Sequence, residues 1–140
     1  MNAAGARRLA LVGVALLAGG LAACREAERT EELVVEVHFD PKPPQVGPCS
    51  LHLELFDQEQ RPLHGARVRV EGNMNHAGMV PEVGSAAEVS PGLYAADLEF
   101  TMGGDWFLVV SAMTEGGDWM ETTVLVPGVK PQSAESRGSE

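Results

Sequence analysis

The sequence predicts an all-β domain, and three observations carry that prediction. Aromatic residues make up only 5% of the 140 residues, while there are 16 Gly and 9 Pro, a composition that favours tight turns over helix packing. Seven short segments have the pattern of strands, most of them with apolar residues at every second position and one mostly apolar. No segment shows the period of an amphipathic helix. Short strands at regular spacing with turn signals between them are typical of an immunoglobulin-like antiparallel β-sandwich of about seven strands.

The individual strands follow from this alternation and from the turn residues between them. In the first three, apolar residues alternate with charged or polar ones, and a Pro-rich stretch at 41–44 separates the first from the second. Turn signals at Ser90-Pro91-Gly92, Gly103-Gly104 and Gly116-Gly117 separate the last four. Trp106 and Trp119 flank the last of these turns and are expected to pack in the core or at an edge, where they could pair across the hairpin. The seven expected strands are 33–39, 51–56, 66–71, 86–89, 94–100, 106–112 and 119–126.

The first residues predict export and lipid attachment. Arg7 and Arg8 precede an uncharged apolar run of about 15 residues, which is too short to span a bilayer and is typical of a secretory signal. The run ends in Leu21-Ala22-Ala23-Cys24, which resembles the lipobox of bacterial lipoproteins. The resemblance implies that residues 1–23 are a signal peptide and that Cys24 carries the lipid. The alternative is an ordinary signal with an accidental cysteine.

The signal peptide and the lipobox-like cysteine imply an extracytoplasmic, lipid-anchored protein. Because Arg25 rather than Asp follows the cysteine, resemblance to enterobacterial sorting implies the outer membrane, facing the periplasm, if the organism is Gram-negative. Residues 24–32 are expected to be a flexible tether, 33–127 the folded domain and 128–140 a disordered tail. The 20 acidic against 10 basic residues exclude nucleic-acid binding and leave membrane attachment to the lipid alone.

Three segments, taken in order, resemble the YtkA-like domain family, which is related to the FixH group of cytochrome oxidase assembly proteins. The first, 57–68, ends in Gly65-Ala66-Arg67-Val68 and has Gln60 where the family usually has glycine. The second is 74–81, and the third begins with Pro91-Gly92-Leu93-Tyr94 and continues at 100–108. The resemblance covers about residues 33–127. It implies a β-sandwich similar in architecture to known copper carriers.

The sequence offers no catalytic motif. A Gly-x-Ser-x-Gly nucleophile, a phosphate loop, a His-Glu-x-x-His pair and a paired-cysteine zinc motif are all missing from its 140 residues. The acidic residues are spread evenly and form no recognisable pair. His38 and His52 fall on the outward faces of their strands, where we expect them to be solvated. We therefore expect a protein that is not an enzyme.

One short motif, Met74-x-His76-x-x-Met79, has ligand chemistry. Thioether sulfur and imidazole suit monovalent copper, and Gly78 can turn the chain so that Met79 folds back toward the other two residues. Met102, in a turn, is the best candidate for a fourth ligand. The alternative is that Met74 and Met79 cap one end of the core while His76 stays solvated.

These observations leave two functions open. The first is a non-enzymatic protein that binds or delivers copper, in oxidase assembly or metal homeostasis, to a cuproprotein or membrane protein complex. The second is a metal-free interaction or accessory module of a membrane complex or efflux system. Cys49, which lacks a partner if Cys24 is lipidated, is expected to be a small buried hydrophobe, with a reactive or metal-binding thiol or an intermolecular disulfide as alternatives.

Overall fold

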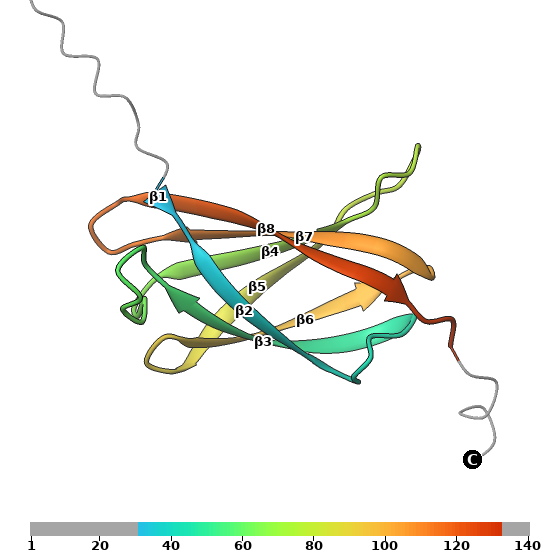
Figure 1. The fold of residues 1–140 in the computed structure, drawn as a ribbon, viewed down its shortest axis with the longest axis horizontal. Coiled ribbons are helices and arrows are strands. Elements are labelled where there is room, and N and C mark those ends of the chain that lie inside the picture. The colour runs from blue at the N-terminus through green and yellow to red at the C-terminus, as the bar shows by residue number, and fades with distance from the viewer. Residues whose placement is uncertain (1–30, 133–140) are drawn as a thin grey trace, which may run out of the picture.

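The computed structural model of the chain describes residues 31–132, which form strands joined by loops and turns (Figure 1). Within this range all regular elements are strands, and none of these residues belongs to a helix that could cross a membrane. The strands are β1 (Glu31–Glu32), β2 (Val34–Asp40), β3 (Gly47–Phe56), β4 (Arg67–Asn73), β5 (Glu82–Ser90), β6 (Leu93–Phe100), β7 (Gly104–Met113) and β8 (Trp119–Val129).

The strand order confirms the predicted immunoglobulin-like sandwich. Along the hydrogen-bonded array the order is β1-β8-β7-β4-β5-β6-β3-β2, and β5 pairs with β4 on one side and with β6 on the other. One layer is therefore β2-β3-β6-β5 and the other is β4-β7-β8, joined through β5. With the seven long strands lettered A to G, these layers are ABED and CFG, the arrangement of immunoglobulin constant domains. All seven predicted strands are present.

The open edge between β2 and β8 is bridged near both of its ends. The backbone N–H of Val46 donates to the Lys130 carbonyl at 2.8 Å, and the Lys130 N–H donates to the Pro44 carbonyl at 3.0 Å. At the other end, β1 adds two residues to β8 in parallel register. These contacts cover backbone groups that an exposed sheet edge would offer to another chain.

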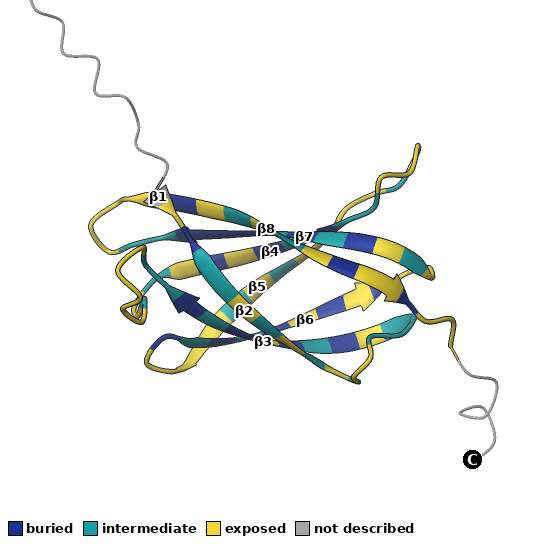
Figure 2. Cartoon of the chain, in the orientation of Figure 1, coloured by how far each residue is buried: buried dark blue, intermediate teal, exposed yellow. Residues whose placement is uncertain are grey.

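The core fills the space between the layers. The inward positions of β3, Leu51, Leu53 and Leu55, are fully buried, and Figure 2 shows buried and exposed positions alternating along the strands. Near the β6–β7 turn, Phe100 meets Trp106 edge to face with ring centroids 5.1 Å apart, a favoured geometry for aromatic rings. All the buried core residues of the described range lie between 33 and 129, so this segment carries its own core.

The structure corrects two expected boundaries and one expected contact. Glu31–Glu32 of the expected tether form β1, and β8 extends past residue 127 to Val129, which is 2% exposed, because that side chain completes the core. Trp106 pairs with Val126, whereas Trp119 pairs with Met113 and is 45% exposed, because the β7–β8 turn places the two tryptophans at opposite ends of the hairpin. The signal peptide, Cys24 and residues 133–140 lie outside the described residues.

Two of the three segments that resemble the YtkA-like family, 57–68 and the one that begins at Pro91, are held together by contacts that we call the clamp. The buried Tyr94 hydroxyl donates to the Leu63 carbonyl at 2.8 Å and accepts the Ala66 N–H at 3.1 Å. Gly92 has φ +78°, and a Cβ there would lie 2.8 Å from Pro62 Cβ, so the close approach of these segments requires glycine. The clamp fixes the β3–β4 connection to the start of β6, which makes these motifs structural.

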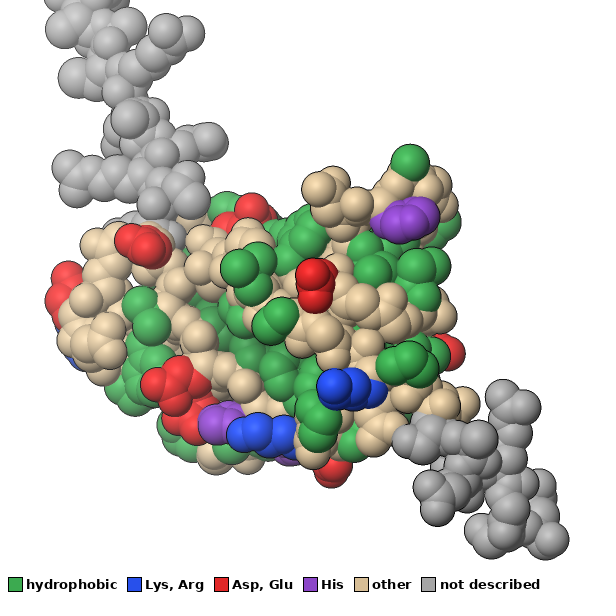
Figure 3. Space-filling model, turned by 45° about the vertical axis from the view of Figure 1, so that its right-hand side comes forward, with side chains coloured by type: hydrophobic (Ala, Val, Ile, Leu, Met, Phe, Trp, Pro, Cys, Tyr) green, Lys and Arg blue, Asp and Glu red, His purple; other side chains and the backbone are tan. Residues whose placement is uncertain are grey.

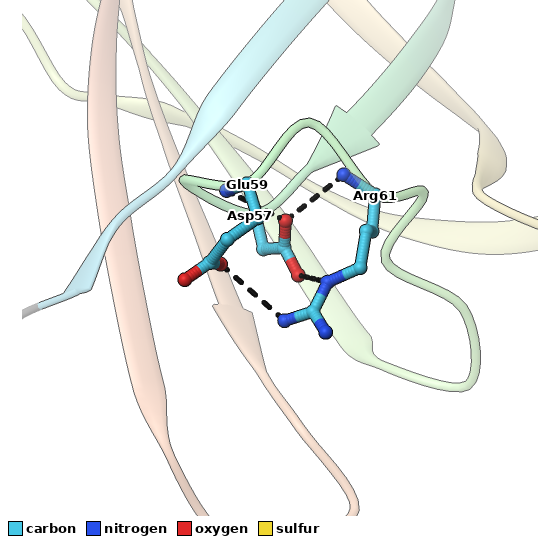
Figure 4. Close-up of polar contacts among 3 residues, drawn as sticks. All are labelled: Asp57, Glu59 and Arg61. Carbon is cyan, nitrogen blue, oxygen red and sulfur yellow. Dashed lines mark hydrogen bonds and ion pairs between the residues drawn. The ribbon is translucent and has the colours of Figure 1, made fainter.

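The turn before the clamp explains how the chain tolerates Gln60. Gln60 has φ 63°, the left-handed conformation that glycine adopts without steric cost. Asp57 stabilises the turn: its carboxylate accepts the backbone N–H groups of Glu59 and Arg61 at 3.0 and 2.9 Å and the Arg61 Nε at 2.8 Å (Figure 4). The Arg61 hydrogen bonds and charge hold the pKa of Asp57 below its usual value.

Candidate metal-binding sites

The loop between β4 and β5, residues 74–81, carries the methionine–histidine motif and projects from one end of the sandwich (Figure 1). The Met74 N–H donates to Met79 Sδ at 3.1 Å, and the Met79 N–H approaches the His76 carbonyl at 3.4 Å. Gly78 adopts φ +82°, so the backbone reverses at the position where the sequence suggested a turn. The loop therefore brings the backbone of Met74 and the sulfur of Met79 into direct contact.

The turn that carries Met102 adjoins this loop. A Cβ built at Gly104 would lie 3.1 Å from Met74 Cε, so the Met74 methyl group packs against the β6–β7 turn two residues from Met102. The Trp106 indole N–H donates to the Met102 carbonyl at 2.9 Å and fixes this turn, while the Met102 side chain remains 41% exposed. Met102 thus lies in the turn adjoining the loop.

The four candidate residues differ in exposure. Met74 and Met79 are half-buried and pack against the edge of the core, as the core-capping alternative expected, whereas Met102 and His76 are exposed. His76 Nδ1 lies 3.3 Å from its neighbour's carbonyl, that of Ala77. Figure 3 shows a histidine side chain among apolar side chains at this projecting end. The loop thus brings the Met79 sulfur to the Met74 backbone, and the exposed His76 imidazole lies on the same short loop.

A second cluster lies on the outer face of β2 and β3. Ligand atoms of Glu36, His38 and Glu54 all lie within 4.8 Å of one another, and His38 Nε2 is 3.6 Å from Glu54 Oε1. The expectation that the acidic residues form no pair was therefore wrong, because Glu36 and Glu54 are directly opposite each other in the register. His38 and His52 are exposed, as expected, and are also register partners.

This cluster could have been recognised in the sequence from two short segments whose residues are in reversed order. Glu36-Val37-His38 on β2 is followed by His52-Leu53-Glu54 on β3. Antiparallel pairing of Glu-x-His with His-x-Glu places like residues opposite each other, all on one face. The pattern becomes informative only once the register is known, because a shift by one residue would turn these side chains inward.

Cys49 and the hollow beside the clamp have structural explanations. Cys49 is 2% exposed within the core, and burial is the main cause that raises the pKa of its thiol. Cys49 therefore fits the expected small buried hydrophobe.

The hollow beside the clamp is lined by residues of the β3–β4 connection and the end of β5. There the Glu88 carboxylate accepts the N–H groups of Gly92 and Gly65 at 3.0 and 2.9 Å. These bonds lower the pKa of Glu88, the Gly92 bond most.

The fold and these sites define an immunoglobulin-like β-sandwich with clusters of metal-ligand side chains on its surface. The chain belongs to the YtkA-like family, whose model matches residues 29–111, from the start of the domain into β7. No significant match was found among the curated proteins or among the solved structures.

Proposed function

We propose that this protein is a lipid-anchored, extracytoplasmic, non-enzymatic domain that binds monovalent copper through the loop between β4 and β5. The observation that carries the proposal is the contact between the Met74 N–H and Met79 Sδ at 3.1 Å, since it brings together the two ends of the motif. Met102, on the adjoining turn, and His76, on the loop, complete the ligand set after side-chain rotation.

The donor chemistry supports copper(I) over harder ions. Thioether sulfur is a soft ligand that copper(I) accepts well and that magnesium or calcium does not, and imidazole adds a nitrogen ligand. The site is at the end of a projecting loop and is formed partly by exposed side chains. An exposed site of this kind suits transfer of the ion to another protein, such as a cuproprotein or membrane complex in oxidase assembly or metal homeostasis.

The proposed location rests on the first 24 residues. A signal peptide over 1–23 and a lipid on Cys24 would anchor the domain to a membrane outside the cytoplasm, in the outer membrane facing the periplasm of a Gram-negative cell. Labelling with a radioactive fatty acid tests the anchor, because a Cys24→Ser chain would remain unlabelled.

Copper competition tests the site. Residues 25–140, which contain the whole described core, would be titrated with Cu(I) against a chromophoric chelator. We expect one bound ion, and at least tenfold weaker binding by a Met74→Leu/His76→Ala/Met79→Leu variant. A matched control, Met113→Leu with His64→Ala, removes a thioether and an imidazole elsewhere and is expected to bind as the parent does. If the loop variant competes as well as the parent, the copper proposal is wrong.

One observation favours the alternative, a metal-free interaction or accessory module of a membrane complex or efflux system. The outer face of the β4-β7-β8 layer and its β5 edge expose Leu125 at 77% and Val83 at 52%, with Val80 of the neighbouring loop at 77%. A partner that spans this face would cover these apolar side chains together, and contiguous exposed apolar surface is typical of protein contacts. In that case a co-purified partner would survive metal chelation and would be lost with Leu125→Glu.

A further inference from the structure

We infer that the outer face of β2 and β3 is a second metal site, which binds a divalent transition-metal ion, copper(II) or zinc(II), through Glu36, His38 and Glu54. This site is built from carboxylate and imidazole groups without sulfur. It shares no residue with the methionine loop, so the inference is independent of the proposed copper(I) function.

The register of the two strands fixes the geometry. Leu53 and Leu55 are fully buried, so the alternate residue Glu54 points outward, and the pairing places Glu36 directly across from it. His38 is the next outward residue on β2, and its Nε2 already lies 3.6 Å from Glu54 Oε1. The three ligand atoms therefore converge because the paired backbones of β2 and β3 carry all three residues.

The charge of this face favours a cation. Two carboxylates directly opposite each other in an antiparallel pair repel and destabilise the sheet. The four strands of this layer, β2, β3, β6 and β5, contain no Lys or Arg, and β6 adds the exposed carboxylates of Asp97 and Glu99. Within residues 31–132, the ion-pair partner of Glu54 is His38, and Glu36 forms no ion pair. A divalent ion would neutralise both carboxylates at once.

The ligand set fits copper(II) or zinc(II). Both accept imidazole nitrogen and carboxylate oxygen, and bonds of about 2.0–2.2 Å require ligand atoms to lie about 3.4 Å apart in a tetrahedron. The present separations, all within 4.8 Å, close to that value by small rotations of exposed side chains. His52, opposite His38 in the register, is positioned to supply a second imidazole, and water completes the coordination.

Zinc titration followed by NMR tests the site. Residues 25–140, without a histidine tag, would be titrated with zinc chloride while imidazole and backbone amide resonances are recorded. We expect one equivalent to shift the His38 ring resonances and the amides of β2 and β3 around Glu36 and Glu54. A Glu36→Gln/Glu54→Gln variant is expected to bind zinc at least tenfold more weakly, as is His38→Ala.

Two controls distinguish this site from the copper(I) loop and from general charge effects. Glu115→Gln/Glu121→Gln removes two carboxylates elsewhere on the surface and is expected to leave the zinc affinity unchanged. The Met74→Leu/His76→Ala/Met79→Leu variant is also expected to keep zinc binding, and the Glu36→Gln/Glu54→Gln variant to keep copper(I) binding. The inference fails if the parent does not bind zinc, or if the parent and the Glu36→Gln/Glu54→Gln variant bind it equally.

Discussion

Replacing Tyr94 with Phe would measure how much the clamp stabilises the sandwich. The hydroxyl is fully buried, and burial raises its pKa, so it is neutral at pH 7 and makes both hydrogen bonds, to Leu63 and from Ala66. A net contribution of about 0.5–1.5 kcal/mol for each bond gives a loss of about 1–3 kcal/mol. For a domain of this size, that loss would lower the Tm by roughly 4–8 °C for each kcal/mol.

Urea denaturation followed by tryptophan fluorescence is the appropriate assay, because Trp106 lies in the core and Trp119 is partly exposed. Thr123→Val, which deletes an exposed hydroxyl on β8, is the matched control and is expected to change the free energy of unfolding by less than about 0.5 kcal/mol. If Tyr94→Phe lowers the free energy of unfolding no more than this control, the two hydrogen bonds do not stabilise the clamp and our reasoning is refuted.

Two further predictions concern the turn and the clamp carboxylate. The Gln60→Gly variant removes the steric cost of φ 63° but adds entropy to the unfolded chain. We therefore expect the free energy of unfolding, measured by urea denaturation, to rise by about 0.5–1 kcal/mol. A lower free energy of unfolding would contradict the strain argument. Because the pKa of Glu88 is lowered from 4.5, its stabilising effect is present above pH 4.5 and is lost as the pH falls through the lowered pKa. The Glu88→Gln variant is therefore expected to have a lower Tm than the parent at pH 7, and its Tm is expected to fall less than that of the parent when the pH drops below 4.5. If the two curves of Tm against pH run parallel, this reasoning is wrong.

Most of the fold could be predicted from the sequence because the alternation of apolar and polar residues indicates directly which segments are strands. The alternation in β3, for example, places Leu51, Leu53 and Leu55 inside, and the structure buries all three. The end of β8 was harder to predict, because Val129 follows Pro127 and Gly128, residues that normally end a strand, and its burial depends on packing against the core.

The candidate sites could be predicted only in part, and the reason is long-range register. The methionine loop was recognisable because its ligands are within six residues of one another. The Glu36, His38 and Glu54 cluster joins residues 18 positions apart, so it appears only when β2 and β3 are aligned. Alternating charged residues on a single strand look like an ordinary solvated face.

The arrangement separates the residues that hold the fold from those that would bind an ion. The clamp uses buried or backbone groups of Tyr94, Gly92 and Ala66, whose alteration would destabilise the sandwich. His76, Glu36 and His38 are exposed, so substituting them removes little packing and should leave a folded protein. Loss of metal binding in such variants would therefore report on the site itself. Membership of the YtkA-like family is therefore informative about the sandwich, whereas metal binding would depend on particular surface residues of this chain, which such variants test one by one.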